Sequence, residues 1–252
     1  DQKTRLLVNW IHEGNELFLK LTGAVIRLAP AGVFALMAGL VQALDWQTFL
    51  GIGKFAATLL LALAVHGFLV LPLIFKAFSG RSLRDYLTKM RPALLTAFST
   101  SSSSATLPLT IECVEKEAQV PKEVAGFVLP VGATVNMDGT AIYEASACLF
   151  IAQALGLELT LLQQLIVFFT ASLAAIGAAA IPSAGLVTLT LVLNAVGLPL
   201  EGIGLLLAID RPLDMSRTVV NVWGDMVGCA VIEGKIQKKE PPAKILKKIQ
   251  KT

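Results

Sequence analysis

Four ionisable residues and one asparagine recur at helical spacing in the last apolar stretch of the chain: Asp210, Asp214, Arg217, Asn221 and Asp225. At 100° per residue, the five side chains fall within a stripe about 80° wide on one helix face. Charged groups within a membrane are costly and normally face an interior site, so the stripe predicts a site for charged solute and cations. The three acids outnumber the one base, which favours cations. The alternative is a buried ion-pair ladder that only joins helices.

A second polar group, Asn136-Met137-Asp138-Gly139-Thr140, interrupts the middle of an apolar stretch that runs to about residue 157. A helix broken there offers an amide, a carboxylate and freed backbone carbonyls, which are ligands that a hard monovalent ion prefers. The pattern therefore predicts bound Na⁺. A simple glycine kink is the alternative, although it would need neither Asn136 nor Asp138. Glu144, one turn further on, is a candidate for proton exchange.

A serine run, Ser101 to Ser104, lies between Arg91 and Glu112 in a segment too polar to face lipid. A full crossing by this segment would also place later basic residues outside, against the positive-inside bias. We therefore expect a re-entrant hairpin over 92–111, about half the hydrocarbon thickness deep. Its serine tip can present backbone N–H groups beside a helix N-terminus, where a carboxylate binds well. A flexible linker is the alternative.

The composition of the chain indicates a polytopic membrane protein, since 55% of its 252 residues are hydrophobic and only 15% are charged. Phe55 to Phe75 is a run without formal charge, long enough to span a bilayer. We expect no cleavable signal peptide, and His12 and His66 receive no role. Basic clusters at both ends and at 81–91 predict cytoplasmic termini and argue against nucleic acid as a partner.

The predicted fold is an all-α membrane protein with four spans and two re-entrant helical hairpins. We expect a cytoplasmic amphipathic lead-in, a transmembrane helix, a unit that holds the site, and a basic cytoplasmic tail, at 1–16, 17–46, 47–234 and 235–252 respectively. The second hairpin lies within 159–200, although two full spans would also fit its length. Because the two hairpins would enter from opposite faces, the order of elements indicates an inverted repeat.

Four motifs then make a family resemblance specific: Ser101 to Pro108, Asn136 to Glu144, Ile181 to Gly185, and Asp214 to Asp225. In order and spacing they resemble the sodium:dicarboxylate symporters, the glutamate/aspartate transporter family. The resemblance implies an elevator-type transport domain, a scaffold role for helix 17–46, a homotrimer, and two or more Na⁺ ions. The substrate-binding residues that it implies are Ser101, Ser102, Ser103, Thr140, Ile181, Pro182, Ser183, Ala184, Gly185, Asp214, Arg217, Thr218 and Asn221.

Charge suggests which of these residues would bind each charged group of an acidic amino acid. The fork of donors on Arg217 would pair with a side-chain carboxylate, Asp214 would take the amino group, and the tip N–H groups would hold the main carboxylate. The resemblance also implies three sodium sites. Their residues are Gly132, Asn136, Asn221 and Asp225 in one, Thr134, Ala175, Ile176 and Ala178 in another, and Asp138 in a third.

The chain departs from the family pattern at several positions. Ser101 and Met215 stand where the family usually has an additional arginine, and Ala180 and Ser183 replace tip glycines of archaeal-type members. Glu144 matches the animal-type glutamate associated with proton and potassium coupling. Family members have further helices before the segment where this chain begins, so we expect either a fragment or a minimal transport unit.

The resulting expectation is a sodium-coupled symporter of acidic amino acids, integral to a plasma or inner membrane, and not an enzyme. A dicarboxylate or neutral amino acid carrier of the same family is the near alternative. Arg217 argues against neutral substrates, and Asp214 argues against a dicarboxylate without an amine. An intramembrane hydrolase is the alternative from another class, but the serines have no G-x-S-x-G context and no adjacent base. A channel is the third alternative function.

Overall fold

The computed structural model describes residues 46–239 and, before them, positions 10, 13–14, 17, 20–21, 24, 31, 34–35 and 38. By its internal contacts the chain divides into two units, residues 1–45 and 46–252. The predicted lead-in 1–16, most of the predicted span 17–46 and the tail from residue 240 onward lie outside the described residues. The second unit contains all the predicted site residues.

Every regular element within 46–239 is helical, which agrees with the predicted all-α class. The first is a continuous apolar helix of 33 residues, Trp46–Phe78. Within the described part of the chain, it alone has the length and composition to cross a membrane. It consists of α2 (Trp46–Val65), a π-helical turn η1 (His66–Val70) and α3 (Leu71–Phe78).

The serine run joins two helices that pack against each other, α4 (Leu83–Thr100) and α5 (Ser103–Glu112), and a π-helical turn η2 (Cys113–Glu117) follows. The predicted limits of this hairpin, 92–111, are too narrow at the start. The helix begins nine residues earlier because Tyr86 and Met90 bury one face while Arg84 and Asp85 stay exposed. Pro92 consequently lies inside α4 rather than at its beginning.

The predicted break at 136–140 separates α6 (Lys122–Val135) from α7 (Asp138–Ala154). Asn136 and Met137 have non-helical backbone angles, with ψ of 86° and 47°. A second pair of packed helices, α8 (Leu161–Ile176) and α9 (Ala184–Ala195), follows, joined by a turn around Pro182. Thr160 and Gln163 form a capping box that starts α8.

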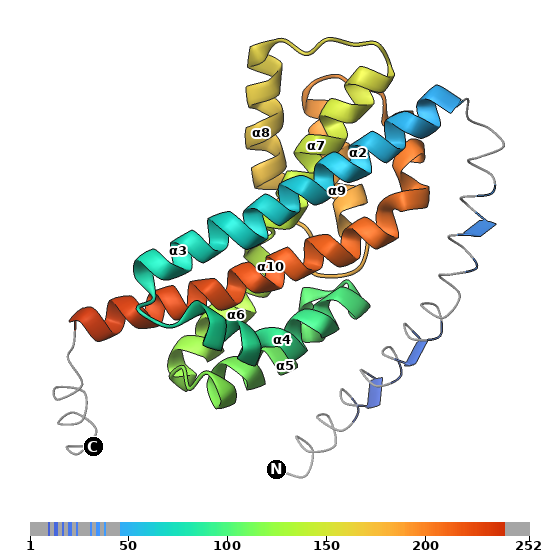
Figure 1. The fold of residues 1–252 in the computed structure, drawn as a ribbon. Helices are drawn as coiled ribbons and strands as arrows, with labels where there is room; N and C mark the ends of the chain where they lie inside the picture. The colour runs from blue at the N-terminus through green and yellow to red at the C-terminus, as the bar shows by residue number, and fades with distance from the viewer. Residues whose placement is uncertain are drawn as a thin grey trace, which may run out of the picture. The chain divides into compact units, whose positions relative to one another are not determined.

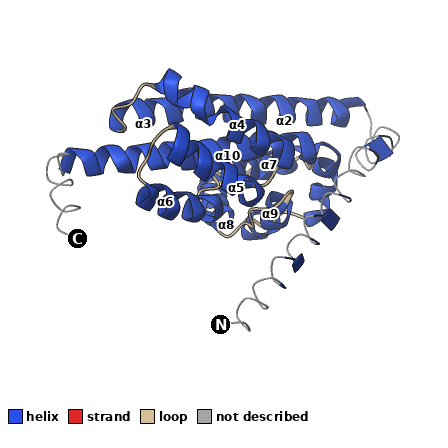
Figure 2. Ribbon diagram, turned by 90° about the horizontal axis from the view of Figure 1, so that it is seen from below, coloured by secondary structure: helices blue, strands red, loops and turns tan. Residues whose placement is uncertain are grey.

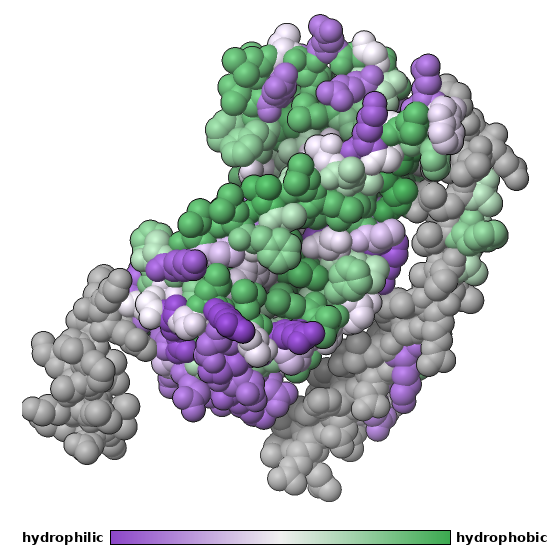
Figure 3. Space-filling view, viewed as in Figure 1, coloured by the Kyte–Doolittle hydropathy of each residue, from purple (hydrophilic) through white to green (hydrophobic). Residues whose placement is uncertain are grey.

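The last helix, α10 (Gly204–Lys239), follows a short 3₁₀ turn η3 (Leu200–Ile203) and contacts α2 to α7. Figures 1 and 2 show α10 running through the middle of the unit, alongside α2 and α3. The rings of Phe75, Tyr86 and Trp223 pack together in its core. The face seen in Figure 3 is largely hydrophobic over α2 and α8, as expected of helices that meet lipid or other apolar segments.

Candidate functional site

The structure buries the whole polar stripe of α10. Asp210, Asp214, Arg217, Asn221 and Asp225 are each between 1 and 7% exposed. The five side chains face the turns of the two helical hairpins and the break between α6 and α7, whereas the opposite face of α10 carries apolar residues such as Val219, Trp223 and Met226. Buried charges require partners, so the contacts of each group define what the site can do.

Arg217 makes both of its ion pairs through one terminal nitrogen, Nη2. Its Nη2 donates to Asp210 Oδ1 at 2.8 Å and to Asp214 Oδ1 at 2.9 Å. The guanidinium carbon lies 3.8 Å from the centroid of the Tyr143 ring, which supports it by a cation–π contact. Its Nε and Nη1 are buried and have no hydrogen-bond partner within the described part of the chain. Arg217 therefore retains two donors for a ligand, which a ladder serving only to join helices would not leave open.

The two turns that join the hairpin helices meet beside the stripe. Ser101 and Ser183 adopt left-handed backbone conformations, with φ of 51° and 60°. Ser102 caps α5 by accepting from Ala105 N, and its hydroxyl donates to Ala180 O at 2.7 Å. This hydrogen bond links the first turn directly to the second.

A small cavity of about 10 Å³ remains where the turns meet α7 and α10, enough for roughly one water molecule. Nine of the residues predicted to bind substrate line it: Ser101, Ser103, Thr140, Ile181, Ala184, Gly185, Asp214, Thr218 and Asn221. Arg217 borders this group, since a Cβ built on Gly185 would lie 2.5 Å from its Nη1. Ser102 and Ser183 act at the edge through hydrogen bonds, and Pro182 belongs to the second turn. The turns are thus closed over the polar groups, with no room for an amino acid.

Hydrogen bonds connect the break between α6 and α7 to α10. Asn221 Oδ1 accepts from Gly139 N at 2.7 Å, and its amide nitrogen lies 3.2 Å from Thr140 Oγ1. The amide of Asn136 donates to Asn221 O at 3.2 Å and to Asp225 Oδ1 at 3.0 Å. The break therefore brings amide, carboxylate and backbone oxygens together at the middle of α10.

The residues predicted for the first sodium site lie side by side. A Cβ on Gly132 would be 2.8 Å from the carboxyl carbon of Asp225, so only glycine lets the two helices approach this closely. Asp138 lies on the other side of this group, and its Oδ2 is 2.6 Å from His66 Nε2. Within the described part of the chain, no cluster of three or more His, Cys, Asp or Glu could hold a metal. An ion here would depend on amide and backbone oxygens together with the Asp225 carboxylate.

The residues predicted for the second sodium site differ in their exposure and in their neighbours. Thr134 is exposed, and its hydroxyl donates to Val131 O at 3.0 Å. Ala175 is buried and packs with Met137, and Ala178 lines the small cavity. Ile176 is half exposed.

Glu144 is fully buried, and Thr188 of α9 donates its hydroxyl to Glu144 Oε1. Glu144 Oε2 is buried and lacks a hydrogen-bond partner among the described residues. Thr188, Tyr143 and His66 are neighbours of the site that were not predicted from the sequence. Only Tyr143 could have been predicted, because it lies three residues after Thr140 and therefore on the same helix face.

Comparison with known proteins places this geometry in a family context. The model of the sodium:dicarboxylate symporter family matches residues 1–235. The chain is 45% identical over 240 residues to excitatory amino acid transporter 3 of Mus musculus, covering 95% of this chain and 46% of that protein. It is 46% identical over 233 residues to excitatory amino acid transporter 4 of Mus musculus, covering 92% and 42%.

A relative with another substrate name also matches. Neutral amino acid transporter B(0) of Rattus norvegicus is 40% identical over 240 residues, covering 94% of this chain and 43% of that protein. The chain thus spans about half the length of the curated relatives it matches. The names of these relatives are all transporter names, and none is that of an enzyme.

Proposed function

Because the chain belongs to the sodium:dicarboxylate symporter family, we propose that it forms the substrate- and ion-binding unit of a sodium-coupled transporter of acidic amino acids. The observation that carries this proposal is the state of Arg217, which is buried, paired through Nη2 and without a partner at Nε and Nη1 among the described residues. A buried guanidinium with two spare donors suits a carboxylate, to which a spare N–H can donate a charge-assisted hydrogen bond.

Asp214 supports the second half of the substrate assignment. In this structure its Oδ1 accepts from Arg217 and its Oδ2 accepts from Ser183 N of the second turn at 2.8 Å. Ser183 N is one of the tip donors that we assign to the main carboxylate of the substrate. On substrate binding, Asp214 would release this N–H and turn to the amino group.

Sodium ions would bind where the break meets α10. We place one at Gly132, Asn136, Asn221 and Asp225, and one at Thr134, Ala175, Ile176 and Ala178. Asp138 would contribute to a third. An anion of net charge −1 entering a negative cell is opposed by about 2.3 kcal/mol per 100 mV. One Na⁺ would only cancel this charge, so at least two ions are needed for the membrane potential to drive uptake. Glu144 would be the residue through which transport is coupled to protons or potassium ions.

The two helical hairpins would act as gates. Helices α8 and α9 have 16 and 12 residues, hence lengths of about 24 and 18 Å, both short of the roughly 30 Å of hydrocarbon. Short paired helices favour re-entrant hairpins over two full spans. The contact between Ser102 and Ala180 would close the site. The elevator movement and the homotrimer are expected from the family resemblance. The cytoplasmic termini are expected from the basic clusters.

A neutral amino acid carrier is the second candidate, because a neutral amino acid transporter is among the relatives. Arg217 favours the acidic substrate, since a neutral side chain would leave its two spare buried donors unsatisfied. Uptake of radiolabelled aspartate and alanine into proteoliposomes, with and without Na⁺, tests the proposal. We expect aspartate uptake that needs Na⁺ and carries inward current. Uptake that persists without Na⁺ and carries no current would overturn it.

A further inference from the structure

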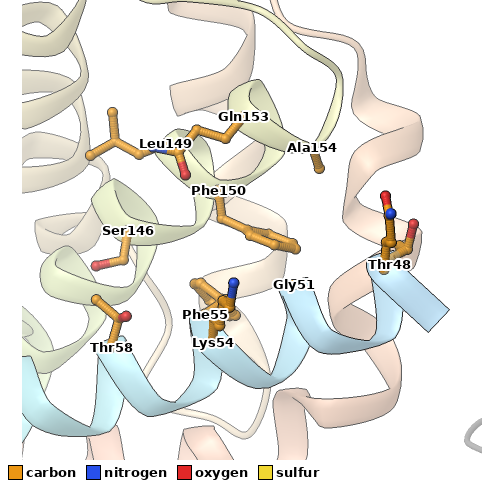
Figure 4. A pocket seen from close by; sticks show the side chains of 11 residues that line it. Thr48, Gly51, Lys54, Phe55, Thr58, Ser146, Leu149, Phe150, Gln153 and Ala154 are labelled. Carbon is orange, nitrogen blue, oxygen red and sulfur yellow. The ribbon is translucent and has the colours of Figure 1, made fainter.

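A much larger cavity than the one between the turns lies between α2 and α7. Its volume is about 530 Å³. Figure 4 shows its lining side chains on the two facing helices. It mixes one cation with hydroxyls, amides and rings: Gln47, Thr48, Gly51, Lys54, Phe55, Thr58, Ser146, Leu149, Phe150, Gln153 and Ala154. None of these residues has a role in the proposed substrate or sodium sites.

Lys54 is the unusual member of this lining. It is one of two charged residues in the apolar helix Trp46–Phe78, and the other, Lys76, lies in the last turn of α3. Figure 4 shows its amino group rising from α2 toward α7. Among the described residues, no carboxylate lies within ion-pair distance of Lys54. A charge placed inside a spanning helix without a partner points to a ligand or to the membrane interface.

The position of Lys54 along the helix matches the depth of lipid headgroups. A helix of 33 residues is about 50 Å long and exceeds the hydrocarbon by about 20 Å, or about 10 Å at each end if centred. Lys54 lies eight residues after Trp46, hence about 12 Å from that end. Its amino group therefore lies close to the boundary between hydrocarbon and headgroups.

The rest of the lining suits a molecule with a polar head and an apolar tail. The rings of Phe55 and Phe150 stack with centroids 5.0 Å apart and form an apolar floor. Leu149 at the rim and Leu50 on the adjoining surface of α2 are both exposed, so apolar surface continues outward from the cavity. Thr58 of α2 and Ser146 of α7 add hydroxyl groups to the lining.

We propose that this cavity binds the headgroup of an anionic phospholipid, with its phosphate on Lys54 and an acyl chain along the floor formed by Phe55 and Phe150. A soluble anion would gain nothing from the apolar floor, and a zwitterionic lipid would gain less from Lys54 because its own cation offsets the phosphate. The proposal depends on the membrane location of the chain and not on the assignment of its substrate.

Native mass spectrometry of the purified chain tests this proposal with phosphatidylglycerol and phosphatidylcholine of identical acyl chains. We expect tighter binding of phosphatidylglycerol, weakened about fivefold in Lys54→Gln, the effect of one lysine near an anionic headgroup. Lys76→Gln is the matched control, because it removes an exposed charge from the same helix away from the cavity, and it should bind as the unmodified chain does.

Two further measurements separate the lipid from other occupants. Ser146→Leu keeps the charge of Lys54 but narrows the cavity, and it should weaken phosphatidylglycerol binding to a similar extent. Inorganic phosphate at millimolar concentration should not displace the lipid. Equal binding of the two lipids, unchanged binding in Lys54→Gln, or displacement by inorganic phosphate would each overturn the proposal.

Discussion

The backbone N–H of Ser183 donates to the carboxylate of Asp214 over 2.8 Å, which ties the turn between α8 and α9 directly to the polar stripe of α10. The same carboxylate accepts from Arg217. A ligand carboxylate held by the second turn must therefore compete with Asp214 for the N–H of Ser183. Opening of the second turn and release of Asp214 are on this account a single event.

Replacing Arg217 by cysteine should change the substrate class. Removing one partner of a buried charge pair costs about 2–5 kcal/mol, so aspartate affinity should fall about 30-fold or more, while neutral amino acids gain relative to it. Competition binding with aspartate and alanine measures both. Arg211→Cys is the control, since that side chain lies 3.9 Å from Asp214 and bonds to it only weakly. Unchanged aspartate binding in Arg217→Cys would refute the assigned role.

Ser102→Ala should weaken closure of the two turns. The substitution removes both the cap on α5, worth about 1 kcal/mol, and the bond to Ala180 O. We expect substrate to dissociate about fivefold to tenfold faster, as measured by chase of bound radiolabel. Ser104→Ala provides the control, because Ser104 reaches Ala180 O only through its backbone N–H. Equal dissociation rates in the two variants would contradict a closing role for Ser102.

Gly185→Ala should disturb the proposed substrate site sterically. The added Cβ would lie 2.5 Å from Arg217 Nη1 and 3.3 Å from Thr140 Cγ2, so the guanidinium must move. Overpacking of this kind costs about 1–3 kcal/mol, and aspartate affinity should fall at least fivefold. Gly177→Ala in the same turn, whose Cβ would meet Ala174 O at 3.5 Å, should bind normally. Titration calorimetry distinguishes the two, and similar affinities would argue against the close approach.

An ion pair at the far end of α10 should matter for stability rather than for binding. Arg81 donates through Nε to Glu233 at 2.7 Å and through Nη1 to Ala118 O at 2.7 Å. The hydrogen bonds with Glu233 raise the pKa of Arg81, so the guanidinium stays charged across the usual pH range. Arg81→Met should therefore lower the free energy of unfolding by about 2 kcal/mol.

The exposed pair of Lys89 and Asp85 gives the comparison for that prediction. Lys89→Met should change the stability by no more than about 0.5 kcal/mol, because solvent screens an exposed pair on one helix. Thermal denaturation in detergent measures both variants. If the two variants melt alike, the Arg81 pair contributes no more than a surface pair.

Much of the fold could be predicted from the sequence because charge and apolar runs are strong signals in a membrane protein. The break at Asn136 and Met137, the burial of the α10 stripe and the serine turn all follow from polar residues placed where lipid would exclude them. The start of α4 could not be predicted in this way, since Arg84 and Lys89 made an amphipathic helix resemble a polar connection. Cross-helix contacts such as Tyr143 with Arg217 or Thr188 with Glu144 depend on packing that spacing within one helix does not reveal.

The central claim is that the site binds an acidic amino acid together with sodium. Equilibrium binding of radiolabelled aspartate to the purified chain, at a series of Na⁺ concentrations and with K⁺ as the replacement ion, tests this directly. We predict binding that requires Na⁺, rises with more than first-order dependence on its concentration, and is lost in Asp225→Asn, which removes a proposed sodium ligand. Equal aspartate binding in Na⁺ and in K⁺ would contradict the account.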